Sequence, residues 1–382
     1  MKRQLVQGWT RRRETSRALL YTPDATDLDL RRHLDEALNW LKRAQDAGSD
    51  AGVAYGVSFG ADFDVSYPET TGYICRTFVE QARLTGDDAL LDRAISMADW
   101  EIDIQLPEGA VMGGKVNTRP TPAVFNTGMV LLGWSALAQH VHEERFKQAA
   151  TRASDWLVSI QEADGRWARG NSRFAAPEAT VYNVMAAWGL CEAGAVLGDE
   201  RYIDAALRNG EYCLSRQHAN GWLPDCCLSD PRSPLLHTLA YSMQGLIGIG
   251  KLTCREDLIA GARLLADSIL GTMQPNGFVP GRLNDDFSAG ADWSCLTGSA
   301  QTSIIWNELH LLTGADVYRT AAITIDDYLM ARHDIRNADP RLRGGLPGSW
   351  PTWGDYGSVR ILNWATKFLV DALSLEQRVS GR

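Results

Sequence analysis

The sequence predicts an all-α protein in which six helical hairpins close into a ring, an (α/α)6 toroid. The main observation is a repeat in which a large apolar residue is followed five positions later by glutamine, about every 57 residues. The copies are Trp40/Gln45, Trp100/Gln105, Trp156/Gln161, Tyr212/Gln217 and Ile269/Gln274, with a degenerate sixth at Tyr328/His333. Such a period, sustained over nearly the whole chain, is typical of stacked supersecondary units.

The first helical pattern of each repeat is amphipathic. In the first copy Leu30, Leu34, Leu38 and Leu41 recur at helical spacing with charged residues between them, which predicts a helix with one solvated face. These helices are expected on the outside of the ring. The outer set is expected near 30–46, 88–105, 144–161, 201–217, 256–273 and 317–333.

The second helical pattern of each repeat is apolar nearly all round, as expected of helices surrounded by other helices. The inner set is expected near 67–86, 125–140, 180–198, 235–254, 296–314 and 357–375. An open α-solenoid is the alternative arrangement, but it needs polar capping repeats at its ends. The segment 357–375 is as apolar as the middle ones, which favours the closed ring.

One repeat array predicts one domain. The toroid is expected over 30–375, preceded by an N-terminal extension at 1–29 and followed by a C-terminal tail at 376–382. The chain of 382 residues is 45% hydrophobic, enough for a large core, and its net charge of −9 argues against general nucleic-acid binding.

The sequence contains no apolar run long enough for a membrane span, and the basic residues 1–17 lack the apolar core of a secretory signal. Seven cysteines, an odd number in apolar segments, indicate reduced thiols, so a cytoplasmic location is predicted. Cys226 and Cys227 are adjacent and lack the usual spacing of metal ligands. No metal and no cofactor are therefore predicted, and the oligomeric state is left open.

Polar residues gather at or near the starts of the inner helices, which share one mouth in a closed ring. Each alone is read most simply as a cap or a satisfied buried group, but together they predict a lined pocket. Six helix N-termini also direct partial positive charge at that mouth, which favours an anionic ligand. The residues concerned are Glu69, Asn126, Tyr182, Asn183, His237, Tyr241, Gln301, Arg360 and Asn363.

The loops that enter the inner helices combine tryptophan with aspartate. Aromatic rings stack on the apolar faces of sugars, and carboxylates accept hydrogen bonds from sugar hydroxyls. The alternative for each tryptophan is closure of its loop over the core. The expected sugar-binding loop residues are Asp64, Trp167, Trp222, Trp293 and Trp353.

Several segments resemble bacterial α/α-toroid proteins that are associated with surface- and exopolysaccharide gene clusters. They are SYPETTGYICRTF (66–78), FNTGMVLLGW (125–134), LLHTLAYSMQGL (235–246), CLTGSAQTSIIW (295–306) and RGGLPGSWPTWGDYGSVRILNWATKF (343–368). The resemblance extends to six-hairpin glycosidases, toroidal polysaccharide lyases and the helical domain of glucuronyl C5-epimerases. It implies a carbohydrate-active protein that binds an acidic, uronate-containing oligo- or polysaccharide.

The repeat itself also resembles the QW motif of squalene and oxidosqualene cyclases. The stretch RASDWLVSIQEADGRW (152–167) contains the basic residue, the tryptophans, the glutamine and the glycine of that motif. The resemblance implies that the glutamine ends one helix and meets the tryptophan of the next hairpin. A terpene-cyclase-like enzyme is therefore an alternative, although the DxDD general acid of such cyclases is missing.

The reaction stays open at this stage. β-Elimination or C5-epimerisation of a uronate needs a base, an acid and a group that neutralises the carboxylate. His237 and Tyr241 lie four positions apart on one helix face, and Asn183 or Asn126, with Arg360, would polarise the carboxylate. This set of Asn, His, Tyr and Arg resembles that of toroidal polysaccharide lyases.

Glycosidic hydrolysis is the next alternative and needs two carboxylates. Glu69 with Asp64, Asp225 or Asp286 would supply them. A non-catalytic polysaccharide-binding or assembly protein would keep the aromatic mouth without needing His237.

Overall fold

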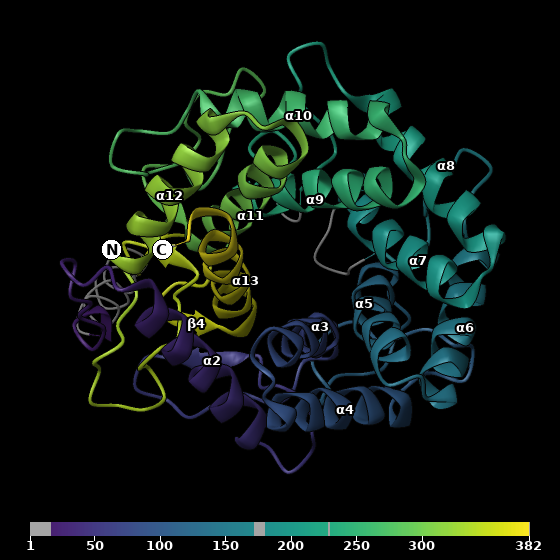
Figure 1. Ribbon diagram of the computed structural model, residues 1–382, viewed down its shortest axis with the longest axis horizontal. Helices are drawn as coiled ribbons and strands as arrows, with labels where there is room; N and C mark the ends of the chain where they lie inside the picture. The colour runs from purple at the N-terminus through teal and green to yellow at the C-terminus, as the bar shows by residue number, and fades with distance from the viewer. Residues whose placement is uncertain (1–16, 172–179, 228–229, 382) are drawn as a thin grey trace, which may run out of the picture.

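The protein forms two concentric rings of helices (Figure 1). The computed structural model describes residues 17–171, 180–227 and 230–381, so part of the expected extension at 1–29 lies outside the described residues. The outer ring contains α2 (Leu30–Asp46), α4 (Asp88–Asp103), α6 (Glu144–Ser159), α8 (Glu200–Arg216), α10 (Glu256–Leu270) and α12 (Asp316–Met330). The inner ring contains α3 (Pro68–Thr85), α5 (Val124–His140), α7 (Val184–Leu197), α9 (Leu236–Thr253), α11 (Leu296–Thr313) and α13 (Asn363–Ser380).

The ring is closed, which confirms the predicted (α/α)6 toroid. Each inner helix contacts the next, and α13 contacts both α11 and α3. Five hairpins join an inner helix to the following outer helix, and the sixth pairs α13 with α2 from the other end of the chain. No helix within the described ranges is long and apolar enough to cross a bilayer.

Short turns join each inner helix to the next outer helix. Gly86 and Gly198 end α3 and α7 with positive φ angles of 73° and 69°, a conformation that glycine adopts without steric cost. The next residues, Asp87 and Asp199, then cap α4 and α8 by accepting hydrogen bonds from backbone N–H groups. The long connections therefore all lie at the opposite end, where the inner helices begin.

Glycines allow the inner helices to pack backbone against backbone. A Cβ atom at Gly133 of α5 would lie 2.4 Å from the carbonyl oxygen of Gly72 on α3. A Cβ atom at Gly189 of α7 would lie 2.0 Å from the carbonyl oxygen of Gly128 on α5. No side chain fits at these contacts, so the close packing of the inner ring depends on glycine.

The last inner helix starts later than expected. The sequence predicted it over 357–375, but residues Arg360–Leu362 form strand β4, which pairs antiparallel with β1 (Gly56–Ser58). A second short pair joins β2 (Ser294–Cys295) to β3 (Ser349–Trp350). At its other end α13 continues to Ser380, five residues past the boundary expected at 375. Arg360 consequently lies on a strand and not at a helix start.

The residues before α2 and at its start contact the connection that follows α12. The Tyr21 hydroxyl donates to the carbonyl of Gly345 at 2.8 Å, and His33 and His333 meet through their Nδ1 atoms at 2.9 Å. The sixth copy of the repeat therefore replaces glutamine with a histidine that contacts another histidine at the seam of the ring.

The repeated glutamine links neighbouring outer helices. Nε2 of Gln161 donates to the carbonyls of Gly165 at 2.9 Å and Ala205 on α8 at 2.8 Å, while Oε1 accepts from Arg208 Nη2 at 2.8 Å. The same pattern recurs at Gln45 and Gln105. The partners are one carbonyl of the loop that follows the glutamine, and one carbonyl and an arginine of the next outer helix. They do not include the tryptophan of the next hairpin that the QW resemblance implied.

Replacing Gln161 with leucine is expected to lower the free energy of unfolding by about 1–3 kcal/mol, because two carbonyls lose a donor and Arg208 loses its acceptor. Urea unfolding followed by circular dichroism measures this change. Gln148→Leu, at an exposed position of the neighbouring helix α6, is the matched control. Equal unfolding midpoints for the two variants would contradict the linking role.

Candidate active site

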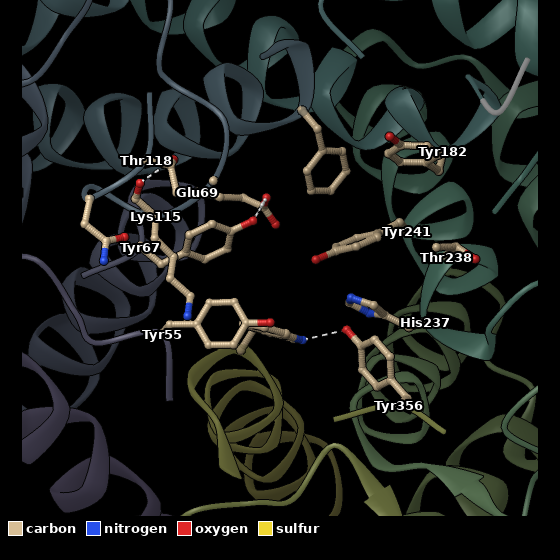
Figure 2. A pocket seen from close by; sticks show the side chains of 14 residues that line it. Tyr55, Tyr67, Glu69, Lys115, Thr118, Tyr182, His237, Thr238, Tyr241 and Tyr356 are labelled. Carbon is tan, nitrogen blue, oxygen red and sulfur yellow. Dashed lines mark hydrogen bonds between the residues drawn. The ribbon is translucent and has the colours of Figure 1, made fainter. Parts of the chain in front are cut away.

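A cavity of about 500 Å³ lies where the inner helices begin (Figure 2). Its walls come from the starts of four inner helices, from the 3-10 turn Val181–Asn183 before α7, and from the long loops. The lining residues are Tyr55, Tyr67, Glu69, Gly114, Lys115, Asn117, Thr118, Phe125, Tyr182, His237, Thr238, Tyr241, Tyr356 and Trp364.

Glu69 is the carboxylate that faces the cavity. It is the second residue of α3, after Pro68, and its Oε2 accepts a hydrogen bond from the Tyr67 hydroxyl at 2.8 Å. Protein atoms surround the carboxyl group except toward the cavity, and this burial raises its pKa to about 7 although the Tyr67 hydrogen bond opposes the shift. A carboxyl group with such a pKa accepts and releases protons near neutral pH.

His237 lines the opposite wall, from the second position of α9 (Figure 2). Burial lowers its pKa to about 4, although a hydrogen bond between Nδ1 and Gln301 Oε1 at 2.5 Å opposes the shift. The ring is therefore neutral at physiological pH. It packs against the Tyr241 ring at an angle of 47°, with 4.3 Å between the ring centroids. Gly298 lets α11 lie against the start of α9, since a Cβ atom there would lie 2.6 Å from the backbone nitrogen of His237.

Positive charge gathers at one end of the cavity around Tyr55. Lys115 Nζ lies 4.5 Å from the centroid of that ring, and the Arg360 guanidinium carbon lies 5.6 Å from it. Asp64 forms an ion pair with Lys115. Burial disfavours the charged form of Asp64, but the Lys115 hydrogen bond and neighbouring charges outweigh it and lower the pKa of Asp64. Two cations thus lie near one aspartate at this end.

Aromatic rings form most of the remaining wall. Tyr55 packs edge-on against Trp364 with ring centroids 4.8 Å apart, and Trp364 Nε1 donates to the Tyr356 hydroxyl at 2.8 Å. On the other side Phe125 packs against Tyr241 at 4.7 Å and Tyr182 at 5.3 Å. The cavity therefore offers rigid ring faces with hydroxyl groups at their edges, a combination that suits a sugar ring.

Four of the residues expected from the sequence line this cavity together, namely Glu69, Tyr182, His237 and Tyr241. The three asparagines do not. Asn126 donates to the carbonyl of Met112 at 2.9 Å, and Asn363 donates to the carbonyl of Ala54 at 2.9 Å. Asn183 donates to Asn171 Oδ1 at 2.9 Å. All three are buried and tie the entering loops to the helices.

The expected tryptophans also lie outside the cavity. Trp167 is fully buried and donates to the carbonyl of Leu157, and Trp222 packs against Phe287. Trp293 is buried beside Gly281, whereas Trp353 is 53% exposed. These side chains take the alternative role of loop closure or surface contact.

Gln301, Asp64 and Arg360 contact residues of the lining, whereas Asp225 and Asp286 contact residues outside it. Gln301 contacts His237, Asp64 contacts Lys115, and Arg360 donates from Nε to the Ser58 hydroxyl at 3.0 Å. Asp225 pairs with Arg216, and Asp286 accepts from the backbone N–H of Ser288.

The cavity also contains residues outside the predicted set, among them Lys115, Tyr356 and Trp364. A positional rule would have found Trp364, because the second residue of an inner helix, or of the turn before it, faces the cavity in several repeats. The residues at that position are Glu69, Phe125, Tyr182, His237 and Trp364.

Comparison with known proteins identifies the fold. No family model matches the sequence, and no curated protein matches it. Solved structures do match. The chain superposes on the unsaturated glucuronyl hydrolase of a Bacillus species, responsible for the degradation of glycosaminoglycan, with a TM-score of 0.72 and 15% identity, covering 92% of this chain and 98% of that one. The fold is that of a six-hairpin toroid.

Two further matches catalyse other reactions. Cellobiose 2-epimerase from Bacillus thermoamylovorans superposes with a TM-score of 0.72 and 10% identity, covering 91% of this chain and 98% of that chain. A D-mannose isomerase superposes with a TM-score of 0.71 and 11% identity, covering 94% and 99%. The architecture is shared across these enzymes, so the reaction has to be argued from the residues of the cavity.

Glu69 is expected to make folding stability fall as pH rises. Its pKa is about 7 in the folded protein and 4.5 as an ordinary glutamate, so the folded state binds the proton more tightly. The free-energy cost of ionising buried Glu69 is absent below pH 4.5, grows between pH 4.5 and pH 7, and is complete above pH 7. Relative to wild type, Glu69→Gln should therefore gain about 2–3 kcal/mol of stability between pH 4 and pH 8.

Urea unfolding of both proteins at a series of pH values measures this difference, in which the other titrating groups cancel. The control is Glu144→Gln, at an exposed position of α6. A stability difference between Glu69→Gln and wild type that does not vary with pH would show that the carboxyl group of Glu69 has an ordinary pKa.

Proposed function

We propose that this chain is a carbohydrate-processing enzyme that binds an acidic, uronate-containing oligosaccharide in the cavity and transfers a proton to or from it through Glu69. The observation that supports this best is that Glu69, whose pKa lies near neutral pH, is the one carboxyl group among the described residues that line an aromatic cavity of sugar size. The sugar enzymes among the matching structures are consistent with the substrate class. The cytoplasmic location expected from the sequence belongs to the same proposal.

The cations around Tyr55 support an acidic sugar. Lys115 is the cationic side chain among the described residues that line the cavity, and Arg360 adds charge behind Tyr55. The starts of the inner helices add partial positive charge at the same end of the ring. A uronate carboxylate bound to Lys115 would be neutralised there, which acidifies the C5 proton next to it.

The arrangement favours β-elimination or C5-epimerisation over hydrolysis by two carboxylates. Within the described part of the chain, Glu69 is the one Asp or Glu residue that lines the cavity. The partners considered from the sequence do not line the cavity. Asp64 is paired with Lys115, Asp225 is paired with Arg216, and Asp286 is exposed and accepts from Ser288. Proton abstraction from carbon instead needs a base and an acid on two sides of the sugar.

Glu69 and the pair His237 and Tyr241 occupy two facing walls of the cavity (Figure 2). In this proposal Glu69 exchanges the C5 proton, because its pKa lies near the working pH. Tyr241, whose pKa burial raises well above 10, stays protonated and donates to the leaving oxygen or to the opposite face of the carbanion. Neutral His237 accepts a hydrogen bond from a sugar hydroxyl and orients the ring.

Glu69→Gln is expected to lower turnover of a uronate-containing oligosaccharide by roughly 10²–10⁴-fold, the usual effect of losing a general acid–base group, with binding largely retained. Incubation in deuterated water separates the reactions. An unsaturated product with ultraviolet absorbance indicates elimination, deuterium at C5 without cleavage indicates epimerisation, and new reducing ends alone indicate hydrolysis.

Glu101→Gln is the matched control, because Glu101 is a buried carboxyl group on the outer helix α4, away from the cavity. Its turnover should stay close to wild type. If Glu69→Gln and Glu101→Gln keep the same activity, Glu69 does not take part in proton transfer. If no oligosaccharide is converted while binding persists, the chain is a binding or assembly protein instead.

Lys115→Met is expected to weaken binding of a uronate oligosaccharide by about 10–100-fold, because a charge-assisted contact is lost and Asp64 is left unpaired beside the ligand. Binding of the neutral analogue should change little. Calorimetric titration at two salt concentrations measures both effects, and Lys147→Met on the outer helix α6 is the control. Equal affinity of the wild type for acidic and neutral sugars would exclude the proposed charge recognition.

A further inference from the structure

A chain of hydrogen bonds runs from His237 away from the cavity. Nδ1 of His237 contacts Oε1 of Gln301 at 2.5 Å, and Nε2 of Gln301 donates to Oε1 of Gln244 at 2.8 Å. Gln301 lies on α11 and is fully buried. Gln244 lies on α9, two turns beyond His237, and lines a second cavity of about 190 Å³ between the C-terminal halves of the inner helices.

The orientation of the Gln301 amide gives this chain a direction, because its nitrogen lies against Gln244 Oε1 and its oxygen lies against His237 Nδ1. A side-chain amide has one end that accepts and one end that donates. Gln301 uses its NH₂ group on Gln244, so its carbonyl oxygen is the end that faces His237. An oxygen can only accept, and Nδ1 of His237 must therefore carry the proton.

The other ring nitrogen, Nε2, then carries no proton and has a free lone pair. A neutral imidazole has one protonated and one bare nitrogen. Nε2 forms no hydrogen bond with any residue in the described ranges, and the ring of His237 points into the cavity (Figure 2). This nitrogen is accordingly available to accept a proton or a hydrogen bond from a bound ligand.

We propose that Gln301 and Gln244 are positioning residues that fix His237 as the Nδ1–H tautomer, so that its bare Nε2 faces the cavity as an acceptor. This assignment of the tautomer does not depend on which reaction the protein catalyses. Its use on a sugar hydroxyl rests on the function proposed above. Gln244 is the informative member, because it reaches His237 only through Gln301 and lines a different cavity.

The test is ¹⁵N NMR of the full chain with labelled histidine at neutral pH, without substrate. Correlation of the ring protons with the ring nitrogens reports which nitrogen carries the proton, and His237→Gln assigns the signals. The wild type should show a protonated Nδ1 and a bare Nε2. Gln301→Leu and Gln244→Leu should each lose this single tautomer, the first because the acceptor is gone and the second because the Gln301 amide is free to turn.

Two further variants keep the test decisive. Gln81→Leu removes a comparable buried bond, from Gln81 to Ser374 between α3 and α13 at 2.8 Å, and should leave the His237 signals unchanged. Gln301→Glu keeps the shape and the acceptor and should retain the proton on Nδ1 even if the leucine variant fails to fold.

A wild-type His237 with its proton on Nε2, or on both nitrogens, would overturn the inference. So would unchanged His237 signals in both leucine variants. Because no substrate is present, these results are independent of the turnover of Glu69→Gln, and a failure of the proposed function does not imitate a failure of the tautomer assignment.

Discussion

The structure depends on the close contact of the inner helices, which glycine makes possible. At Gly133 and Gly189 a Cβ atom would collide with the backbone of the neighbouring helix, so α5 can approach α3, and α7 can approach α5, to backbone contact. Close packing of this kind leaves the neighbouring side chains few rotamers and the helices little room to shift. It places the second residue of several inner helices at a defined position on the wall of one cavity, and the outer helices, joined by their glutamines, keep the ring at that size.

Burial in the cavity shifts the pKa values of two side chains in opposite directions. Removal from water disfavours charge, so the pKa of Glu69 rises to about 7 while the pKa of His237 falls to about 4. A carboxyl group that exchanges protons near neutral pH thus faces a ring that stays neutral. Neither residue requires a special charged partner for this, because the low polarity of the aromatic wall is sufficient.

The repeat was readable from the sequence because its period and its glutamines are local patterns. The bounds of the helices followed to within a few residues, except for α13. Its start is shifted because pairing of Arg360–Leu362 with Gly56–Ser58 outweighs the helical pattern, and its end extends to Ser380. Site residues were harder. Glu69 and His237 could be found because they are polar residues at helix starts, but Asn126 and Asn363 share that feature and bind loop carbonyls instead. Which of two adjacent side chains faces a cavity depends on helix rotation, and composition does not determine it.

The position of α13 has a consequence for how the protein is assembled. Asn363 at its start bonds to Thr70 on α3, across 293 positions of sequence, and α2 packs on its outer side. During synthesis α13 follows every other described helix, so until it emerges the inner ring is an open arc with two unpaired apolar flanks. Contacts between distant segments form slowly, and exposed apolar surface in partly folded chains promotes association. The cavity, whose wall includes Trp364, therefore forms only after α13 has been synthesised and has packed against α3 and α11.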